Sequence, residues 1–181
     1  QVIGGTPVCS DPGWIEVSPA TDSVYVACNG DETIVKLAGD NLALLGSYDT
    51  GDVRVSRFLV APPRLLLLDE VNRKLHVLDM ASGDFVAETT ISGQPNQVAL
   101  WDAQRMFVTE RQGGRVAVLE GVEQPAWVDE VAAGSDPFGV TAVVPWGRVF
   151  AVARQGAELP EAGAYTGDPG VVYAIDPDGL E

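Results

Sequence analysis

The sequence has few of the residues that build metal sites, haem attachment sites and nucleic-acid interfaces. Its 181 residues include two cysteines, Cys9 and Cys28, and one histidine, His76. Zinc, iron–sulfur and c-type haem sites need more Cys and His than this, so we expect no metal and no cofactor. Eleven Lys and Arg stand against 26 Asp and Glu, a net charge of −15. A polyanion of this kind is a poor partner for nucleic acid or an anionic membrane.

Long hydrophobic runs are also missing. No apolar stretch approaches 18 residues, so we expect no transmembrane segment. The chain begins with Gln1 rather than Met, which we interpret as removal of a signal peptide or as a piece of a longer protein. With 46 % hydrophobic and 20 % charged residues the chain can build a core, which excludes general disorder.

Short apolar segments recur at a fixed spacing. Segments 24–27, 65–68 and 106–109 start 41 residues apart, and a fourth, 149–152, follows 43 residues later. A second set trails the first at 34–37, 75–78, 116–119 and 172–175, and two further sets flank these. All are rich in Val, Leu, Ile and aromatic residues, Gly and Pro cluster between them, and none holds a helical period.

Four short strands in every ~41 residues are typical of a β-propeller blade, a twisted antiparallel sheet whose two faces pack on neighbouring blades. Both faces then need apolar residues, which explains the unbroken run Leu65–Leu68. We therefore predict an all-β propeller of four-stranded antiparallel blades, with about four blades in this chain.

A glycine followed closely by proline precedes most of these units. The pattern reads Gly5-Thr6-Pro7 before the strand Val24-Tyr25-Val26-Ala27, and Gly93-Gln94-Pro95 before Met106-Phe107-Val108-Thr109. In this it resembles the YVTN-repeat propellers, found in bacterial and archaeal surface and periplasmic proteins and in some amine dehydrogenase subunits. The resemblance implies an extracellular, cell-surface or periplasmic protein and rings larger than four blades. Unit two departs from it, because Gly51-Asp52-Val53 replaces Gly-x-Pro.

The predicted boundaries leave the last unit one strand short. We expect one propeller domain or segment made of a closing strand at 1–7 and blades at 8–51, 52–93, 94–137 and 138–181, the last with an insertion at 157–170. The N-terminal strand, Gln1–Gly5, matches the strand missing at the end and is expected to close the last blade. A compact four-bladed ring, an eight-bladed ring of two chains, and a piece of a larger propeller all remain open. An open half-ring would expose whole apolar faces and would need a partner.

One face of a propeller carries the loops between fourth and first strands and between second and third strands. Cys9 and Cys28 would share that face in one blade, which favours a disulfide and an oxidising compartment, although two small buried residues remain the alternative. Polar residues on the same face are candidates for binding, with ordinary solvation and surface ion pairs as the alternative. They are Arg57, Glu70, Gln97, Glu110, Arg111 and Arg154.

The insertion is the second candidate for recognition, because long loops on a rigid scaffold are frequent binding sites. Its candidate residues are Tyr165, Glu158, Glu161 and Asp168, although a tolerated surface insertion would look the same. The segment 176–181 weakly resembles a calcium loop and is predicted to be an ordinary turn. We expect His76 to be packed in a third strand rather than to serve as a base or ligand.

No nucleophile–base pair stands out, so we expect no catalytic residue and lean against an enzyme. The sequence favours an exported, non-catalytic propeller that acts as a protein-binding or assembly scaffold, with a protein partner or self-association. The alternative is a propeller subunit or domain of a periplasmic oxidoreductase or of another propeller enzyme.

Overall fold

The computed structural model describes residues 5–155 and 170–179, which form antiparallel sheets and two short 3-10 turns. The first blade contains β1 (Pro12–Ser18), β2 (Ser23–Cys28), β3 (Thr33–Ala38) and β4 (Leu44–Asp49). The second contains β5 (Val55–Ala61), β6 (Arg64–Asp69), β7 (Lys74–Asp79) and β8 (Phe85–Thr90). The third contains β9 (Pro95–Leu100), β10 (Arg105–Glu110), β11 (Arg115–Glu120) and β12 (Ala126–Ala132). The last contains β13 (Ser135–Val143), β14 (Arg148–Gln155) and β15 (Val171–Ile175).

Each sheet is a meander in which strands pair in chain order. The turns are closed by residues that supply side-chain oxygens or positive φ. The carboxylate of Asp79 accepts hydrogen bonds from the backbone amides of Ala81 and Ser82, which satisfies donors that the β7–β8 turn leaves unpaired. Gly114, at φ +64°, lies so close to Gly134 that an added Cβ would be 2.7 Å from its carbonyl oxygen. Only glycine fits there.

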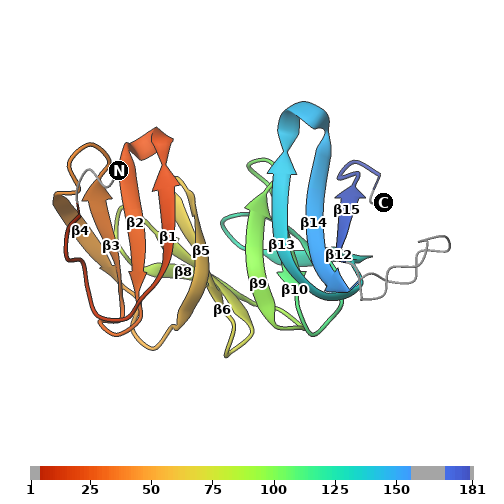
Figure 1. Cartoon of the computed structure of the whole chain (residues 1–181), viewed down its shortest axis with the longest axis horizontal. Coiled ribbons are helices and arrows are strands. Elements are labelled where there is room, and N and C mark those ends of the chain that lie inside the picture. Colours follow the sequence, from red (N-terminus) through yellow and green to blue (C-terminus); the bar gives the residue numbers. More distant parts are fainter. Residues whose placement is uncertain (1–4, 156–169, 180–181) are drawn as a thin grey trace.

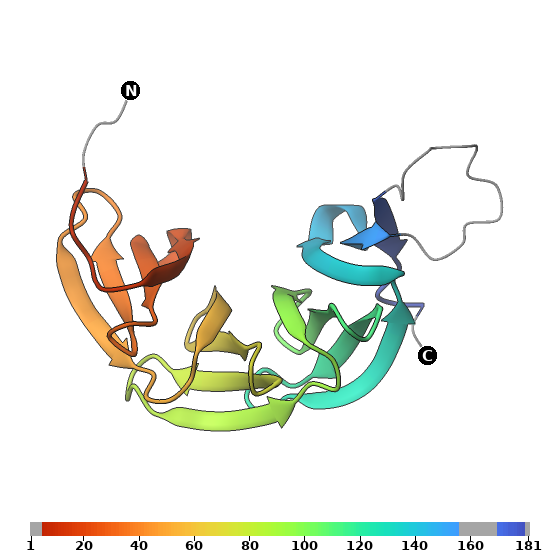
Figure 2. The ribbon, with the colours of Figure 1, turned by 60° about the horizontal axis from the view of Figure 1, so that its bottom comes forward.

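The four sheets follow one another around a common axis (Figure 1). Their first strands, β1, β5, β9 and β13, line the inner side of an arc, and successive ones are in contact. Figure 2 shows the rim strands β4, β8 and β12 on the outer side of that arc. The all-β architecture of antiparallel blades predicted from the repeat is therefore confirmed.

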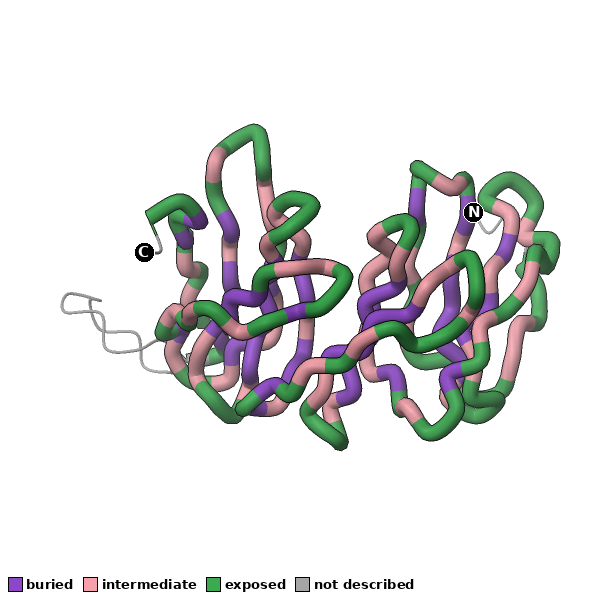
Figure 3. Tube along the Cα trace, turned by 180° about the vertical axis from the view of Figure 1, so that it is seen from behind, coloured by how far each residue is buried: buried purple, intermediate pink, exposed green. Residues whose placement is uncertain are grey.

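The core consists of layers between adjacent sheets, and its buried residues lie mainly on the second and third strands of the blades (Figure 3). Side chains alternate between the two faces of a strand. The second strand of a blade that has neighbours on both sides therefore contributes side chains to the layer on each side. In β6, Leu65 and Leu67 pack toward the first blade, whereas Leu66 and Leu68 pack toward the third. All four are fully buried, which is the reason that this strand is apolar without alternation.

The described residues form an open arc with the first and last blades at its two ends (Figure 2). The four sheets cover only part of a turn, and the first and last blades do not meet. The compact four-bladed ring is therefore not the arrangement in the structure. The expected closing strand, Gln1–Gly5, lies outside the described residues except for Gly5. The last blade has three strands within the described part of the chain.

Candidate functional site

Charged residues from all four blades gather along the inner side of the arc. We call them the inner array, and its members are Trp14, Glu16, Arg57, Glu70, Gln94, Arg111, Asp136 and Arg154. The turns after β6 and β10 contribute Glu70 and Arg111, and the link between β8 and β9 contributes Gln94. These turns and links lie on one face of a propeller, which is how residues from separate repeats come together.

Ion pairs join the array from the second blade to the last. The Nη1 atom of Arg111 lies 3.8 Å from Oε1 of Glu70, and its Nε donates to Oδ1 of Asp136 at 2.7 Å. The other carboxylate oxygen of Asp136 lies 3.3 Å from Nη1 of Arg154. Gln94 also donates to Glu70. The hydrogen bond to Asp136 raises the pKa of Arg111 above its ordinary value, because it stabilises the charged guanidinium.

An aromatic contact extends the array to the first blade. The guanidinium of Arg57 stacks 3.9 Å from the ring centroid of Trp14, and the indole Nε1 donates to Oε1 of Glu16 at 2.9 Å. Burial lowers the pKa of Arg57, while the charge of Glu70 partly offsets this. Each charge in the array thus faces an opposite charge or a ring. Such an arrangement holds polar groups in place but leaves no activated base or nucleophile among them.

The structure brings Arg57, Arg111 and Arg154 together as the sequence suggested, and it corrects one candidate. Glu110 is fully buried and is not part of a binding surface. Its Oε2 accepts hydrogen bonds from the Gly93 amide at 2.7 Å, from Ser92 Oγ at 3.0 Å and from Arg115 Nε at 3.0 Å. It therefore anchors the link between the second and third blades, because alternation along β10 puts it on the same face as the buried Met106 and Val108.

Other candidates have structural surroundings or lie outside the described residues. Within the described part of the chain, no group of His, Cys, Asp and Glu could hold a metal ion. Asp176 closes a turn, as predicted: its Oδ1 accepts a hydrogen bond from the Asp178 amide at 3.2 Å. His76 is buried, and burial lowers its pKa. The insertion candidates Glu158, Glu161, Tyr165 and Asp168 lie outside the described residues.

Sequence reasoning missed Trp14, Glu16, Gln94 and Asp136. A usable signal existed for two of them. Gln94 and Asp136 sit in or just after the links between fourth and first strands, which the propeller pattern already places on the face of Arg111. Trp14 and Glu16 gave no such signal, because alternation within β1 alone does not show which blade they meet.

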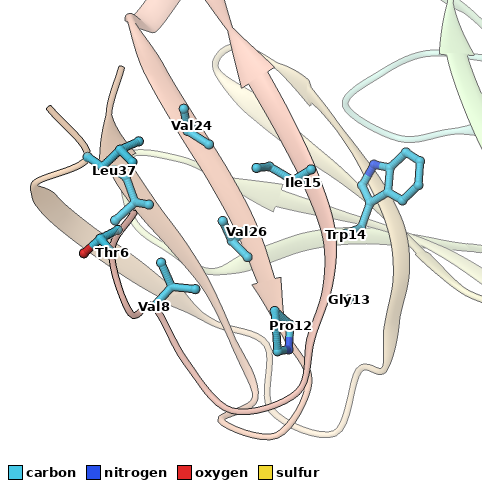
Figure 4. A pocket seen from close by; sticks show the side chains of 10 residues that line it. Thr6, Val8, Pro12, Gly13, Trp14, Ile15, Val24, Val26 and Leu37 are labelled. Carbon is cyan, nitrogen blue, oxygen red and sulfur yellow. The ribbon is translucent and has the colours of Figure 1, made fainter. Parts of the chain in front are cut away.

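Two further surfaces lie at the ends of the arc. The outward side of the first blade, which we call the first-blade face, carries Ile15, Val17, Val24, Val26, Val35 and Leu37. It is hollowed by a pocket of about 350 Å³, next to which Thr6 and Val8 of the N-terminal segment lie (Figure 4). A disulfide between Cys9 and Cys28, with 5.8 Å between their Cα atoms, ties that segment to β2.

The outward side of the last blade, which we call the last-blade face, carries Thr141, Phe150, Val152, Val172 and Ala174. Val172 is 65 % exposed, and Trp146, 71 % exposed, makes an edge contact with Phe150 at 6.1 Å between ring centroids. Both end faces are apolar over most of their width, and their charged residues lie near strand ends: Asp49 on the first blade, and Arg148 and Arg154 on the last. Exposed apolar sheet faces of this kind mark interaction sites.

This chain covers about half the length of each of two similar solved structures. The Kuenenia stuttgartiensis hydrazine synthase is 16 % identical, with a TM-score of 0.72 over 97 % of this chain and 49 % of that one. The Cps50 (Swd1) β-propeller domain of Myceliophteria thermophila is 11 % identical, with a TM-score of 0.67 over 84 % of this chain and 52 % of that one. The chain has the β-propeller fold.

A third similar structure has nearly the same length as this chain. The computationally designed Ika4 protein is 13 % identical, with a TM-score of 0.65 over 95 % of this chain and 99 % of that one. No protein-family profile and no curated protein sequence matches the chain. Similarities at these identities establish the fold and leave the membership in the YVTN-repeat class a prediction. Within the described residues, no helix is long and apolar enough to span a bilayer.

Proposed function

We propose that this chain is a non-catalytic assembly scaffold, a set of four propeller blades whose two end faces are covered by further blades. The observation that carries this proposal is the match between the free faces and the buried ones. The first-blade face presents Val24 and Val26 at the positions of β2 that Leu65 and Leu67 occupy in β6. In β6 these positions pack on the preceding blade.

The same holds at the other end. Phe150 and Val152 occupy in β14 the positions that Leu66 and Leu68 occupy in β6, where they pack on the following blade. Burying such side chains stabilises a contact by about 25 cal/mol for each Å² of apolar area. A blade is therefore the partner whose shape and chemistry fit each face. Among the described residues no strand pairs with the outer edge of β15, which leaves room there for a rim strand.

The inner array supports a scaffold over an enzyme. Catalytic sites combine a nucleophile or base with a pKa displaced toward its task. In the described array, Arg111 has a raised pKa through its bond to Asp136, and each carboxylate faces an arginine or accepts a side-chain hydrogen bond. His76 lies in β7, away from the first strands and the turns and links that carry most of the array. We therefore favour the scaffold over a subunit of a periplasmic oxidoreductase.

We also propose export to an extracellular, cell-surface or periplasmic location. The support is the Cys9–Cys28 disulfide, since disulfides persist in oxidising compartments and are rare elsewhere. The resemblance to YVTN-repeat proteins points the same way. Oxidation state in protein isolated from its native source, measured by thiol labelling, tests this: labelling of both cysteines without reductant would contradict export.

Photo-crosslinking in the native source tests the scaffold. A photoreactive residue replaces Val172 on the last-blade face, and in the control it replaces Val128, 49 % exposed on the rim strand β12. We expect adducts from position 172 to a β-propeller segment, identified by mass spectrometry, and none from position 128. Absence of adducts at 172 would contradict the scaffold. An adduct with a propeller segment of any origin supports it.

A further inference from the structure

The two end faces of this chain are complementary to each other. We propose, building on the scaffold function, that the partner is a second copy of this chain, and that the last-blade face of each copy packs on the first-blade face of the other. Each junction would repeat the geometry of the three junctions already inside the chain. Two copies would then give a ring of eight blades with two identical new junctions.

The apolar side chains match position by position. In the junction between the second and third blades, Leu66 and Leu68 of β6 meet Met106 and Val108 of β10. The same positions at the free ends hold Phe150 and Val152 in β14 and Val24 and Val26 in β2. Val8 and Cys9 of the N-terminal segment already pack on part of the first-blade face, where Val26 is 7 % exposed, so a second copy would contact this face together with that segment. In the three internal junctions the residues equivalent to Val24 and Val26 are Leu65 and Leu67, Met106 and Val108, and Val149 and Ala151, so the two valines lie within the range of sizes that these layers hold.

An arginine at the start of the second strand in the second, third and last blades provides a second, polar match. Arg64 pairs with Asp79 of its own blade and reaches across to Glu123 in the β11–β12 turn of the next blade, at 2.6 Å from Nη2. Arg105 repeats this with Glu120, 3.1 Å away, and with the carbonyl of Pro177 in the corresponding turn of the last blade.

The equivalent arginine of the last blade is Arg148. It pairs with Asp176 of its own blade at 3.3 Å and is otherwise 46 % exposed, because no blade among the described residues packs on this side of it. The turn that a following first blade would bring to it is 39–43, which carries the exposed carboxylate of Asp40. The unmatched arginine at one end thus has an acidic turn as its counterpart at the other end, which favours this chain as the occupant.

The span of the arc agrees with two copies. The chain covers 52 % of the Cps50 β-propeller domain and 49 % of the hydrazine synthase chain. One copy therefore supplies about half of a complete ring, and a second copy supplies the other half. The two junctions form together, so a closed pair is favoured over an open chain of copies.

The mass of the purified 181-residue chain in solution tests this directly. Light scattering after gel filtration should give twice the 19.1 kDa of one chain. A single-copy mass at micromolar concentration would overturn the proposal, and so would an open-ended series of larger species. If the chain is a single copy while position 172 still crosslinks to another polypeptide in the native source, the scaffold stands and the second copy does not.

Two sets of variants locate the contact. Val152→Arg places a charge in the apolar junction and should weaken pairing by about 100-fold or more, whereas Val128→Arg on the rim should leave it unchanged. Circular dichroism and the melting temperature verify that both remain folded. A pair that survives Val152→Arg would show that another surface holds it and would overturn the proposal.

Exchanging the charges of Arg148 and Asp40 is a more specific test, because its outcome depends on which residue each of them contacts in the other copy. Arg148→Glu and Asp40→Arg should each weaken pairing, by about fivefold at each junction, and the double variant should restore it. Failure of the double variant to recover any affinity would contradict the proposed register between the two copies.

Discussion

Phe107 and Phe150 occupy the same position in the second strands of neighbouring blades, and their surroundings differ. Phe107 is fully buried in the layer between the third and last blades, whereas Phe150 lies on the last-blade face with its ring against Trp146. The comparison shows that the repeat makes both faces of every blade apolar, whether or not a neighbouring blade follows. Each end face therefore carries the apolar side chains of an internal junction, but no neighbouring blade among the described residues packs on it.

The largest effect on stability is expected at Phe107, and the loss at Phe150 should be much smaller. Phe107→Ala should lower the free energy of unfolding by about 3–5 kcal/mol, because it leaves a cavity in a closed layer. Phe150→Ala should lower it by about 1 kcal/mol when the chain is dilute and unpaired, since this side chain is only partly buried and no blade among the described residues packs on it. Urea unfolding at low protein concentration measures both. Equal losses would show that the two surroundings are alike in solution.

The two ends also differ in how they are fastened. The disulfide joins Cys9 and Cys28 across 19 residues of sequence and fixes the N-terminal segment at the first-blade face. We expect Cys9→Ser with Cys28→Ser to lower stability by about 2–4 kcal/mol, as loss of a native crosslink of this length usually does. Hydrogen exchange should rise in β1–β3 and stay unchanged in β13–β15. A rise that is uniform across the blades would contradict a local role for the crosslink.

A buried histidine gives the second blade a pH dependence that the end faces lack. Burial lowers the pKa of His76 below 6.5, and the charge of Glu88, whose Oε2 lies 3.7 Å from Nδ1, offsets this only in part. The unfolded chain therefore binds a proton near pH 6.5 and the folded chain only at lower pH, so stability is constant above that value and falls as the pH drops below it.

The variant His76→Leu should remove this loss between pH 7 and pH 5, as measured by melting temperature at both values. The lowered pKa values of Asp79 and Glu88 act at more acidic pH, because their ordinary values are 3.8 and 4.5. These two carboxyl groups therefore do not affect the comparison of melting temperatures between pH 7 and pH 5. An unchanged slope in the variant would show that another group titrates in this range.

The smallest effect is expected in the inner array. Arg111→Ala removes contacts to Glu70 and Asp136, but Arg111 is partly exposed, and surface ion pairs contribute at most about 1 kcal/mol. A double-mutant cycle with Asp136→Ala measures the coupling between the two side chains. A coupling well above 1 kcal/mol would mean that the array holds the blades together and is more than a polar lining.

Much of the fold could be predicted from the sequence, because a blade is a local structure. Strand positions follow from a 41-residue period and from turn residues within each unit, and the unbroken run Leu65–Leu68 already implied neighbours on both sides. The array was predicted only in part. Topology placed Arg57 and Arg111 on one face of the propeller. Glu110 directly precedes Arg111 in the chain, yet its side chain is fully buried in the core.

The amino-acid sequence by itself determined the blades, their antiparallel order and the apolar character of both faces of each sheet. These depend on alternation and turns, which act over a few residues. Only the tertiary structure decided that four blades form an open arc and that Trp14 stacks on Arg57. It also decided that the N-terminal segment packs on the first-blade face, whereas Val172 on the last-blade face stays exposed. The curvature depends on how side chains from separate repeats fill the space between sheets, and no single repeat contains that information.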